Sequence, residues 1–122
     1  MNSSNLKELG FTEPLLLHKL TMEDLPYQSG LFALIDKSEG ATTDIVYIGR
    51  AKNLIKRIFG DIIGGQGKKS VRKIHERLFT EGCLQKLEIS WLPSDNVRAR
   101  KTDLVQRFKQ EHAEMPAWNK KA

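Results

Sequence analysis

The chain reads GLFALID at residues 30–36 and IVYIG at residues 45–49. Both runs are short and apolar, and the second is rich in β-branched and aromatic residues, which is typical of strands. The segment from Ser38 to Asp44, with Gly40 inside it, has the composition of a turn. We therefore expect these two strands to lie next to each other in a hairpin.

Two amphipathic helices are predicted directly after this hairpin. Asn53 is a favourable N-cap residue. It precedes apolar residues at every fourth position, a helical spacing, namely Leu54, Ile58 and Ile62. The sequence GGQG at 64–67 ends this helix and begins a loop. A second helix is predicted by the same spacing and is closed by Gly82; its apolar residues are Val71, Ile74, Leu78 and Phe79.

The remainder of the chain predicts one more strand and one more helix. Residues 87–92 alternate between apolar and polar and end at Pro93, so they predict a third strand. Ser94–Asn96 is a capping sequence for a third helix, which Pro116 interrupts. The predicted class is therefore α+β (α/β), with a three-stranded, mainly antiparallel central sheet flanked by three helices. Residues 1–28 are expected to be a lead-in packed on the core of a domain that spans 29–122.

Length and composition restrict the class of protein further. A chain of 122 residues with 39% hydrophobic residues predicts one globular domain. No run approaches the roughly 18 apolar residues of a membrane span, and the N-terminus does not resemble a secretory signal. Cys83 is the single cysteine of the sequence, so no internal disulfide can form. We expect a cytoplasmic protein without a membrane partner.

Positive charge is concentrated in the middle of the chain. Residues 50–77 contain nine Lys and Arg but two Asp and Glu, whereas residues 1–49 contain three basic and seven acidic residues. A basic segment on a nearly neutral body is typical of an anion-binding surface, most often one for nucleic acid. The alternative is a solvated, lysine-rich helix face. The predicted nucleic-acid contacts are Arg50, Lys52, Lys56, Lys68, Lys69, Arg72 and Lys73.

Three short segments together resemble the GIY-YIG nuclease superfamily. They are Gly-Leu-Phe at 30–32, the stretch YIGRAKNLIKR at 47–57, and Pro-Ala-Trp-Asn at 116–119. The second segment is also similar to the N-terminal incision domain of the bacterial nucleotide-excision-repair nuclease. The resemblance spans about residues 29–119 and implies a GIY-YIG-like fold.

The resemblance also implies a catalytic site. Tyr47 would orient or activate the nucleophile, and Arg57 would donate to the scissile phosphate through its planar guanidinium. Gly49 would allow a close approach at the strand end, Arg50 matches a basic position after the motif, and Asn119 matches a closing asparagine. The implied function is an endonuclease that hydrolyses DNA phosphodiester bonds with one Mg²⁺ or Mn²⁺ ion. RNA is the alternative nucleic acid, and a partner protein could supply targeting.

Three positions depart from the family pattern. Phe32 stands where the first motif usually ends in tyrosine, and Asp61 stands where a histidine or tyrosine often follows the arginine. Lys101 stands where the resemblance places a metal-binding glutamate, and a protonated lysine cannot bind a metal ion. Three interpretations follow: the protein binds nucleic acid without cutting it, Lys101 compensates phosphate charge directly, or the alignment of this helix is off. In the third case the family pattern needs an insertion between Phe108 and Pro116. The insertion contains Glu111 and Glu114, neither of which the sequence places within reach of the motif. A protein-interaction domain is a further alternative.

Two more residues have alternative roles. His75 lies on the predicted apolar side of its helix, where a half-buried histidine with a satisfied ring is favoured over a catalytic base. Trp118 is expected to be packed, with base stacking as the alternative.

Overall fold

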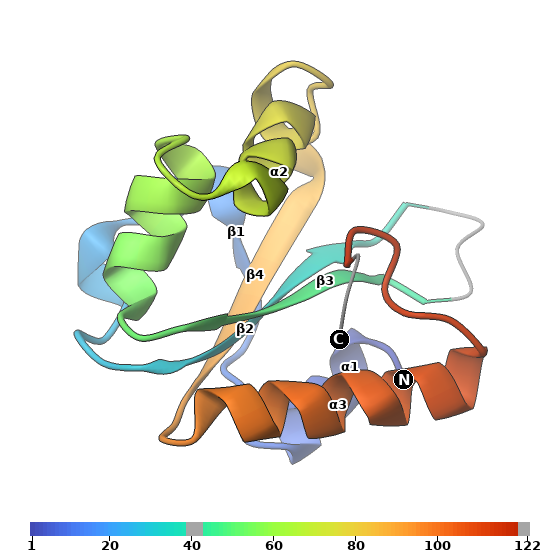
Figure 1. Cartoon of the computed structure of the whole chain (residues 1–122). Helices are drawn as coiled ribbons and strands as arrows, with labels where there is room; N and C mark the ends of the chain where they lie inside the picture. Colours follow the sequence, from blue (N-terminus) through green and yellow to red (C-terminus); the bar gives the residue numbers. More distant parts are fainter. Residues whose placement is uncertain (39–42, 120–122) are drawn as a thin grey trace.

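A four-stranded antiparallel sheet lies between two layers of helices in the computed structural model (Figure 1). The model describes residues 1–38 and 43–119. Part of the predicted turn and the last three residues of the predicted domain therefore lie outside the described residues. The strands are β1 (Leu15–Leu16), β2 (Gly30–Asp36), β3 (Ile45–Ala51) and β4 (Leu87–Pro93). Their order in the sheet is β1-β4-β2-β3, and the protein belongs to the α+β class.

The central strand β2 explains why its sequence is apolar without alternation. It pairs with β3 on one side and with β4 on the other. Residues 30–35 are buried, since helices cover both faces of the sheet. Phe32 and Leu34 belong to the core on one face, whereas Leu31 and Ala33 belong to the core on the other.

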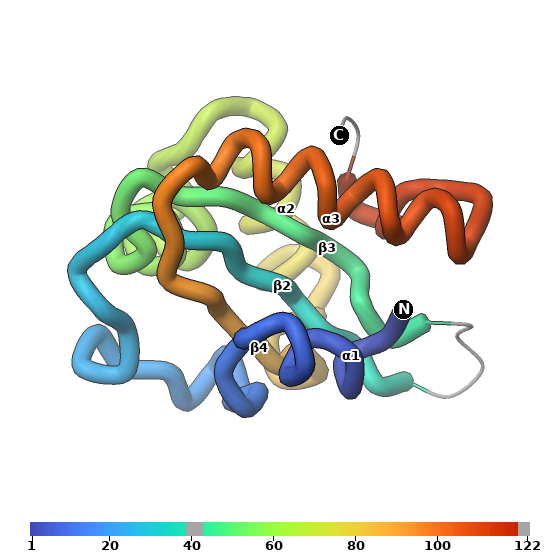
Figure 2. The backbone as a smooth tube through the Cα atoms, turned by 90° about the horizontal axis from the view of Figure 1, so that it is seen from below, coloured from blue at the N-terminus to red at the C-terminus, as the bar shows by residue number. Residues whose placement is uncertain are grey.

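Different parts of the chain cover the two faces. On one face lie the π-helix η3 (Lys56–Ile63), α2 (Lys69–Phe79) and the short 3₁₀ segments η1 (Leu17–Lys19), η2 (Met22–Asp24) and η4 (Leu84–Lys86). On the other face lie α1 (Ser3–Glu8) and α3 (Val97–His112), which Figure 2 shows side by side beneath the sheet. Both helices place apolar residues in one core cluster, namely Leu6, Leu104, Val105 and Phe108.

The predicted number of strands was wrong. A fourth strand, β1, pairs with Ile89 and Glu88 of β4 at the edge of the sheet. It has two residues, and both are exposed, so it leaves no alternating pattern in the sequence. It lies in the segment 1–28, which also contributes buried residues to both cores, namely Leu6, Phe11, Leu17, Leu20 and Leu25.

Two helix starts differ in how they are capped. The Asn53 side chain accepts a hydrogen bond from the Lys56 N–H at 3.2 Å, as expected of an N-cap residue. Asn96 precedes α3 as predicted, but it has a φ of 52° and its side chain makes no capping hydrogen bond. Asparagine tolerates this left-handed conformation better than most residues do. The first N–H groups of α3 therefore receive no hydrogen bond acceptor from the Asn96 side chain.

Within the described residues, no helix is long and apolar enough to cross a membrane.

Candidate functional site

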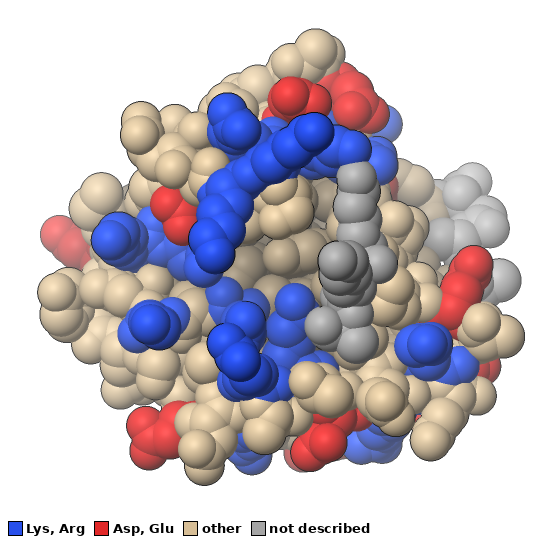
Figure 3. Space-filling model, in the orientation of Figure 1, with Lys and Arg blue, Asp and Glu red and all other residues tan. Residues whose placement is uncertain are grey.

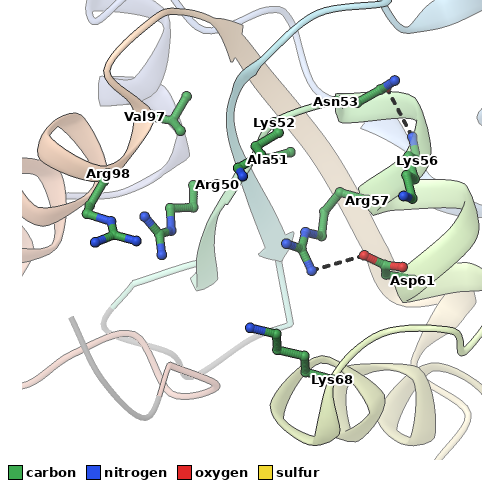
Figure 4. A pocket seen from close by; sticks show the side chains of 10 residues that line it. All are labelled: Arg50, Ala51, Lys52, Asn53, Lys56, Arg57, Asp61, Lys68, Val97 and Arg98. Carbon is green, nitrogen blue, oxygen red and sulfur yellow. Dashed lines mark hydrogen bonds and ion pairs between the residues drawn. The ribbon is translucent and has the colours of Figure 1, made fainter.

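A basic pocket of about 420 Å³ lies where the end of β3, the start of η3 and the first turn of α3 meet (Figure 4). Six of its ten lining residues are cations and one is an acid. The cations are Arg50, Lys52, Lys56, Arg57, Lys68 and Arg98, and the acid is Asp61; Ala51, Asn53 and Val97 complete the lining. Figure 3 shows Lys and Arg side chains around a hollow on this side of the molecule.

The path of β3 beside the pocket depends on Gly49. Gly49 pairs with Phe32 of β2. The rings of Phe32 and Tyr47 have centroids 5.8 Å apart. A Cβ atom on Gly49 would lie 2.4 Å from Phe32 Cζ and 2.7 Å from Tyr47 Cε2. Glycine is therefore required here so that two aromatic rings can pack against the strand that leads to Arg50.

Tyr47 is half-buried, and the charges of Arg57 and Arg50 act on its hydroxyl. Burial raises the pKa of Tyr47 above 10.0, and the charges of Arg57 and Arg50 oppose this shift. The hydroxyl is therefore protonated at neutral pH and can donate a hydrogen bond to an anion. The buried Phe32 beside it adds an aromatic ring but no second hydroxyl.

Arg57 and Asp61 form an ion pair within η3. Arg57 Nη1 lies 3.0 Å from Asp61 Oδ2, and both side chains are partly buried. Figure 4 shows the Arg57 guanidinium turned toward Asp61 at the pocket. Asp61 therefore neutralises Arg57 in part and holds its guanidinium in position.

Lys101 lies in the same positively charged region. It is half-buried on α3, and its pKa is lowered by burial first and then by the charges of Arg50 and Arg57. The structure thus brings together Tyr47, Arg50, Arg57 and Lys101 from three separate elements. Lys101 therefore adds positive charge beside the pocket without being a lining residue.

Asn119 lies away from the pocket and is bound to the edge of the sheet. Its Oδ1 accepts from the Ile48 N–H and its Nδ2 donates to the Ile48 carbonyl, both at 2.9 Å. The Trp118 N–H donates to the Val46 carbonyl at 2.8 Å. Residues 116–119 therefore act as a clamp along the outer edge of β3, and the Asn119 amide both accepts from and donates to that strand.

The other predicted contacts divide into two groups. Arg50, Lys52, Lys56 and Lys68 line the pocket, but Lys69, Arg72 and Lys73 lie exposed on α2 outside the lining. Sequence reasoning missed Arg98, which lines the pocket from α3. Its spacing of three from Lys101 places both on one side of the helix, and this pattern could have identified it.

His75 and Trp118 have structural contacts. His75 Nδ1 is 3.0 Å from the Ile62 carbonyl, and its ring lies 4.7 Å from that of Phe79. This contact joins α2 to the end of η3, as expected of a half-buried histidine. The Arg77 guanidinium lies 5.1 Å from the ring centroid of Trp118, a cation–π contact between α2 and the clamp.

The donor set does not fit the expected Mg²⁺ or Mn²⁺ ion. Mg²⁺ is usually held by one or two free carboxylates together with water and substrate phosphates. Within residues 1–38 and 43–119, no three His, Cys, Asp or Glu side chains are grouped so that they could hold a metal ion. The single carboxylate of the pocket lining, Asp61, is paired with Arg57. The arrangement is instead suited to an anionic ligand.

The chain was also compared with known proteins. No model of a protein family, no curated protein and no solved structure matched it.

Proposed function

We propose that this protein is a GIY-YIG-like nucleic-acid-binding module that holds a phosphate group of the nucleic acid in the basic pocket and does not cut the strand. The observation that carries the proposal is the charge of the pocket lining, which has six cations and one ion-paired acid. Nucleic acid is a common ligand for a concentrated basic surface. The resemblance of residues 30–32, 47–57 and 116–119 to the nuclease superfamily supports the same ligand.

Each group has a defined part in this binding. Arg50 and Arg57 present planar guanidinium groups, which donate to two phosphate oxygens at once. Tyr47 supplies a neutral hydroxyl donor nearby. Lys52, Lys56 and Lys68 are exposed and add charge without a fixed geometry. Asp61 orients Arg57 and reduces its charge.

Lys101 is the residue that argues against hydrolysis. The resemblance places a metal-binding glutamate at its position, and a lysine there repels a divalent cation. The positive charge beside Arg50 and Arg57 can attract phosphate but supplies no ligand for a metal ion. Binding without cleavage is therefore the function that these groups support best.

Binding is tested by fluorescence anisotropy with labelled single-stranded DNA, duplex DNA and RNA over a range of salt concentrations. We expect affinity to fall linearly with salt on a double-logarithmic plot, because counterions are released from the phosphates. Arg50→Gln should weaken binding at least about tenfold at low salt and reduce the slope by about 1. Lys109→Gln is the matched control, because Lys109 is exposed on α3 and does not line the pocket. Equal affinities for these two variants would contradict the proposal.

Cleavage is tested separately with supercoiled plasmid and branched DNA in Mg²⁺ or Mn²⁺. We expect the wild-type protein to leave both substrates intact. Cleavage by the wild type that Arg57→Ala abolishes would instead establish an endonuclease. Lys101→Glu is included because it restores the residue type of the family pattern, and a gain of cleavage in this variant would identify the position as the one that limits activity.

A further inference from the structure

The basic pocket holds more uncompensated positive charge than one internal phosphodiester can match. We propose that its preferred ligand is a phosphate monoester, the dianionic group found at the end of a nucleic-acid strand or on a free nucleotide. This inference rests on the proposed function and specifies the kind of phosphate that the pocket selects. Three observations carry it.

The first observation is the convergence of cations from three elements. Arg50 on β3 and Arg57 on η3 both line the pocket, and their charges act on Lys101 of α3. Among the described residues, Asp61 is the one acid of the pocket lining, and it is paired with Arg57. Lys101 lies half-buried beside the two guanidinium groups, and its lowered pKa has burial and repulsion as its causes. A ligand with two negative charges offsets more of the repulsion between these cations than a ligand with one negative charge does.

The second observation is the direction of α3. Val97 and Arg98, in the first turn of this 16-residue helix, line the pocket. The first turn has no acidic residue, and the Asn96 side chain does not cap it. The positive end of the helix dipole, equivalent to roughly half an elementary charge, therefore adds to the side-chain charges at the same pocket.

The third observation is size. A volume of about 420 Å³ lies toward the small end of the range for pockets that enclose one small ligand. A single phosphate group fits such a space, and the cations that line the pocket can then act together on that one group. A monoester carries about −1.5 to −2 at pH 7, whereas an internal diester carries one negative charge.

The inference is tested with one short oligonucleotide prepared with a 5′-phosphate, with a 3′-phosphate and with hydroxyl groups at both ends. We expect at least one phosphorylated form to bind about tenfold more tightly than the hydroxyl form in anisotropy measurements. Lys101→Met and Arg98→Gln should each reduce this preference. Lys109→Met, a change of the same kind at an exposed position of α3 outside the pocket lining, should keep it.

The pH dependence provides a second readout. The charges that act on Lys101 are those of Arg50 from β3 and Arg57 from η3. The same two arginines act on Tyr47, Asp61 is paired with Arg57, and Arg98 lies three residues before Lys101 on α3. The second pKa of a phosphate monoester is about 6. We therefore expect the preference for the phosphorylated end to shrink as the pH falls below about 6, while binding of the hydroxyl form changes less.

Different failures have different meanings. Equal binding of all three oligonucleotides would overturn this inference and leave the proposed function in place. No salt-dependent binding of any of them would overturn both. Displacement of the phosphorylated strand by a nucleoside monophosphate at a similar concentration would support the monoester and identify the free nucleotide as its source, whereas failure to displace would support the strand end.

Discussion

At its C-terminal end α3 places Glu111 and His112 against the amino group of Met1, whereas at its N-terminal end Arg98 and Lys101 lie beside Arg50 and Arg57. We call these the paired end and the cationic end of the helix. At the paired end, the hydrogen bond to the Met1 amine lowers the pKa of Glu111. The Nε2 atom of His112 lies 2.8 Å from the same amine.

The two ends of α3 use charged side chains in different ways. At the paired end opposite charges meet, and they join α3 to the segment that leads into α1. At the cationic end like charges are held close together, which lowers stability. Under the proposed function, a bound phosphate would offset this repulsion. Unsatisfied charge that the fold itself does not need is typical of a functional site. Changes at the paired end should therefore affect stability, and changes at the cationic end should affect ligand binding.

The largest effect is expected for Phe108→Ala, near the paired end. Phe108 is 1% exposed, and its ring lies 4.4 Å from that of His112. Removal of a buried aromatic ring typically costs about 3–5 kcal/mol. Chemical denaturation should show this loss, while the folded fraction keeps its affinity for nucleic acid. Phe79→Ala is the control, because Phe79 is exposed and should change stability far less. A loss of affinity in the folded Phe108→Ala protein would contradict the division between the two ends.

Asn119→Ala should have the next largest effect, in the clamp that follows the paired end. The substitution leaves the Ile48 N–H and carbonyl without their partner, and each unsatisfied buried group costs about 1–3 kcal/mol. Amide hydrogen exchange at Ile48 should accelerate as the edge of β3 opens. Asn119→Asp tests the donor separately, because it keeps an acceptor for the N–H and removes the donor to the carbonyl. Unchanged exchange at Ile48 in both variants would show that the clamp does not hold β3.

Lys101→Met should stabilise the protein by about 1 kcal/mol while it weakens binding, because an unpaired, half-buried cation is replaced by an apolar side chain. In the folded protein the pKa of Lys101 lies below its ordinary value of 10.5, because the side chain is partly buried and lies near Arg50 and Arg57. Between the folded-state pKa and 10.5, the unfolded chain therefore binds more protons than the folded protein. In this pH range the stability of the wild type rises with pH relative to that of the variant. The advantage of the variant should be complete below the lowered pKa and shrink as the pH approaches 10.5. Denaturation of both proteins at several pH values measures this, and a constant difference would contradict it.

The smallest effect is expected for Lys109→Gln. Lys109 is exposed in the last turn of α3, where a cation interacts favourably with the helix dipole. The loss should be a few tenths of a kcal/mol at low salt, with no change in affinity. A weakened affinity in this variant would mean that the binding surface extends beyond the cationic end.

Much of the fold could be predicted because its signals are local. The strands β2, β3 and β4 and the helices α2 and α3 follow from apolar spacing, and the predicted strand at 30–36 matches the bounds of β2. The strand β1 could not be predicted, because two exposed leucines have no pattern of their own. It exists because β4 offers it hydrogen-bonding partners, which only the tertiary structure provides.

The candidate site was predicted less completely, for a similar reason. Arg50, Lys56 and Lys68 belong to one basic segment, so composition alone identified them. Arg98 lies far along the chain and reaches the pocket because α3 crosses the sheet near the end of β3. The role of Asn119 in holding Ile48 depends on a pairing between residues 71 positions apart. Contacts between residues so far apart in the sequence cannot be predicted from the spacing of neighbouring residues.

The position of the clamp along the chain has a consequence for biosynthesis. Ribosomes make the strand β3 long before residues 116–119, so a growing chain presents β3 with part of its outer edge open. An open edge is a template for pairing with other chains. We therefore expect its nascent chains to pair with other chains most readily when translation stalls within α3, before residues 116–119 can cover the edge of β3.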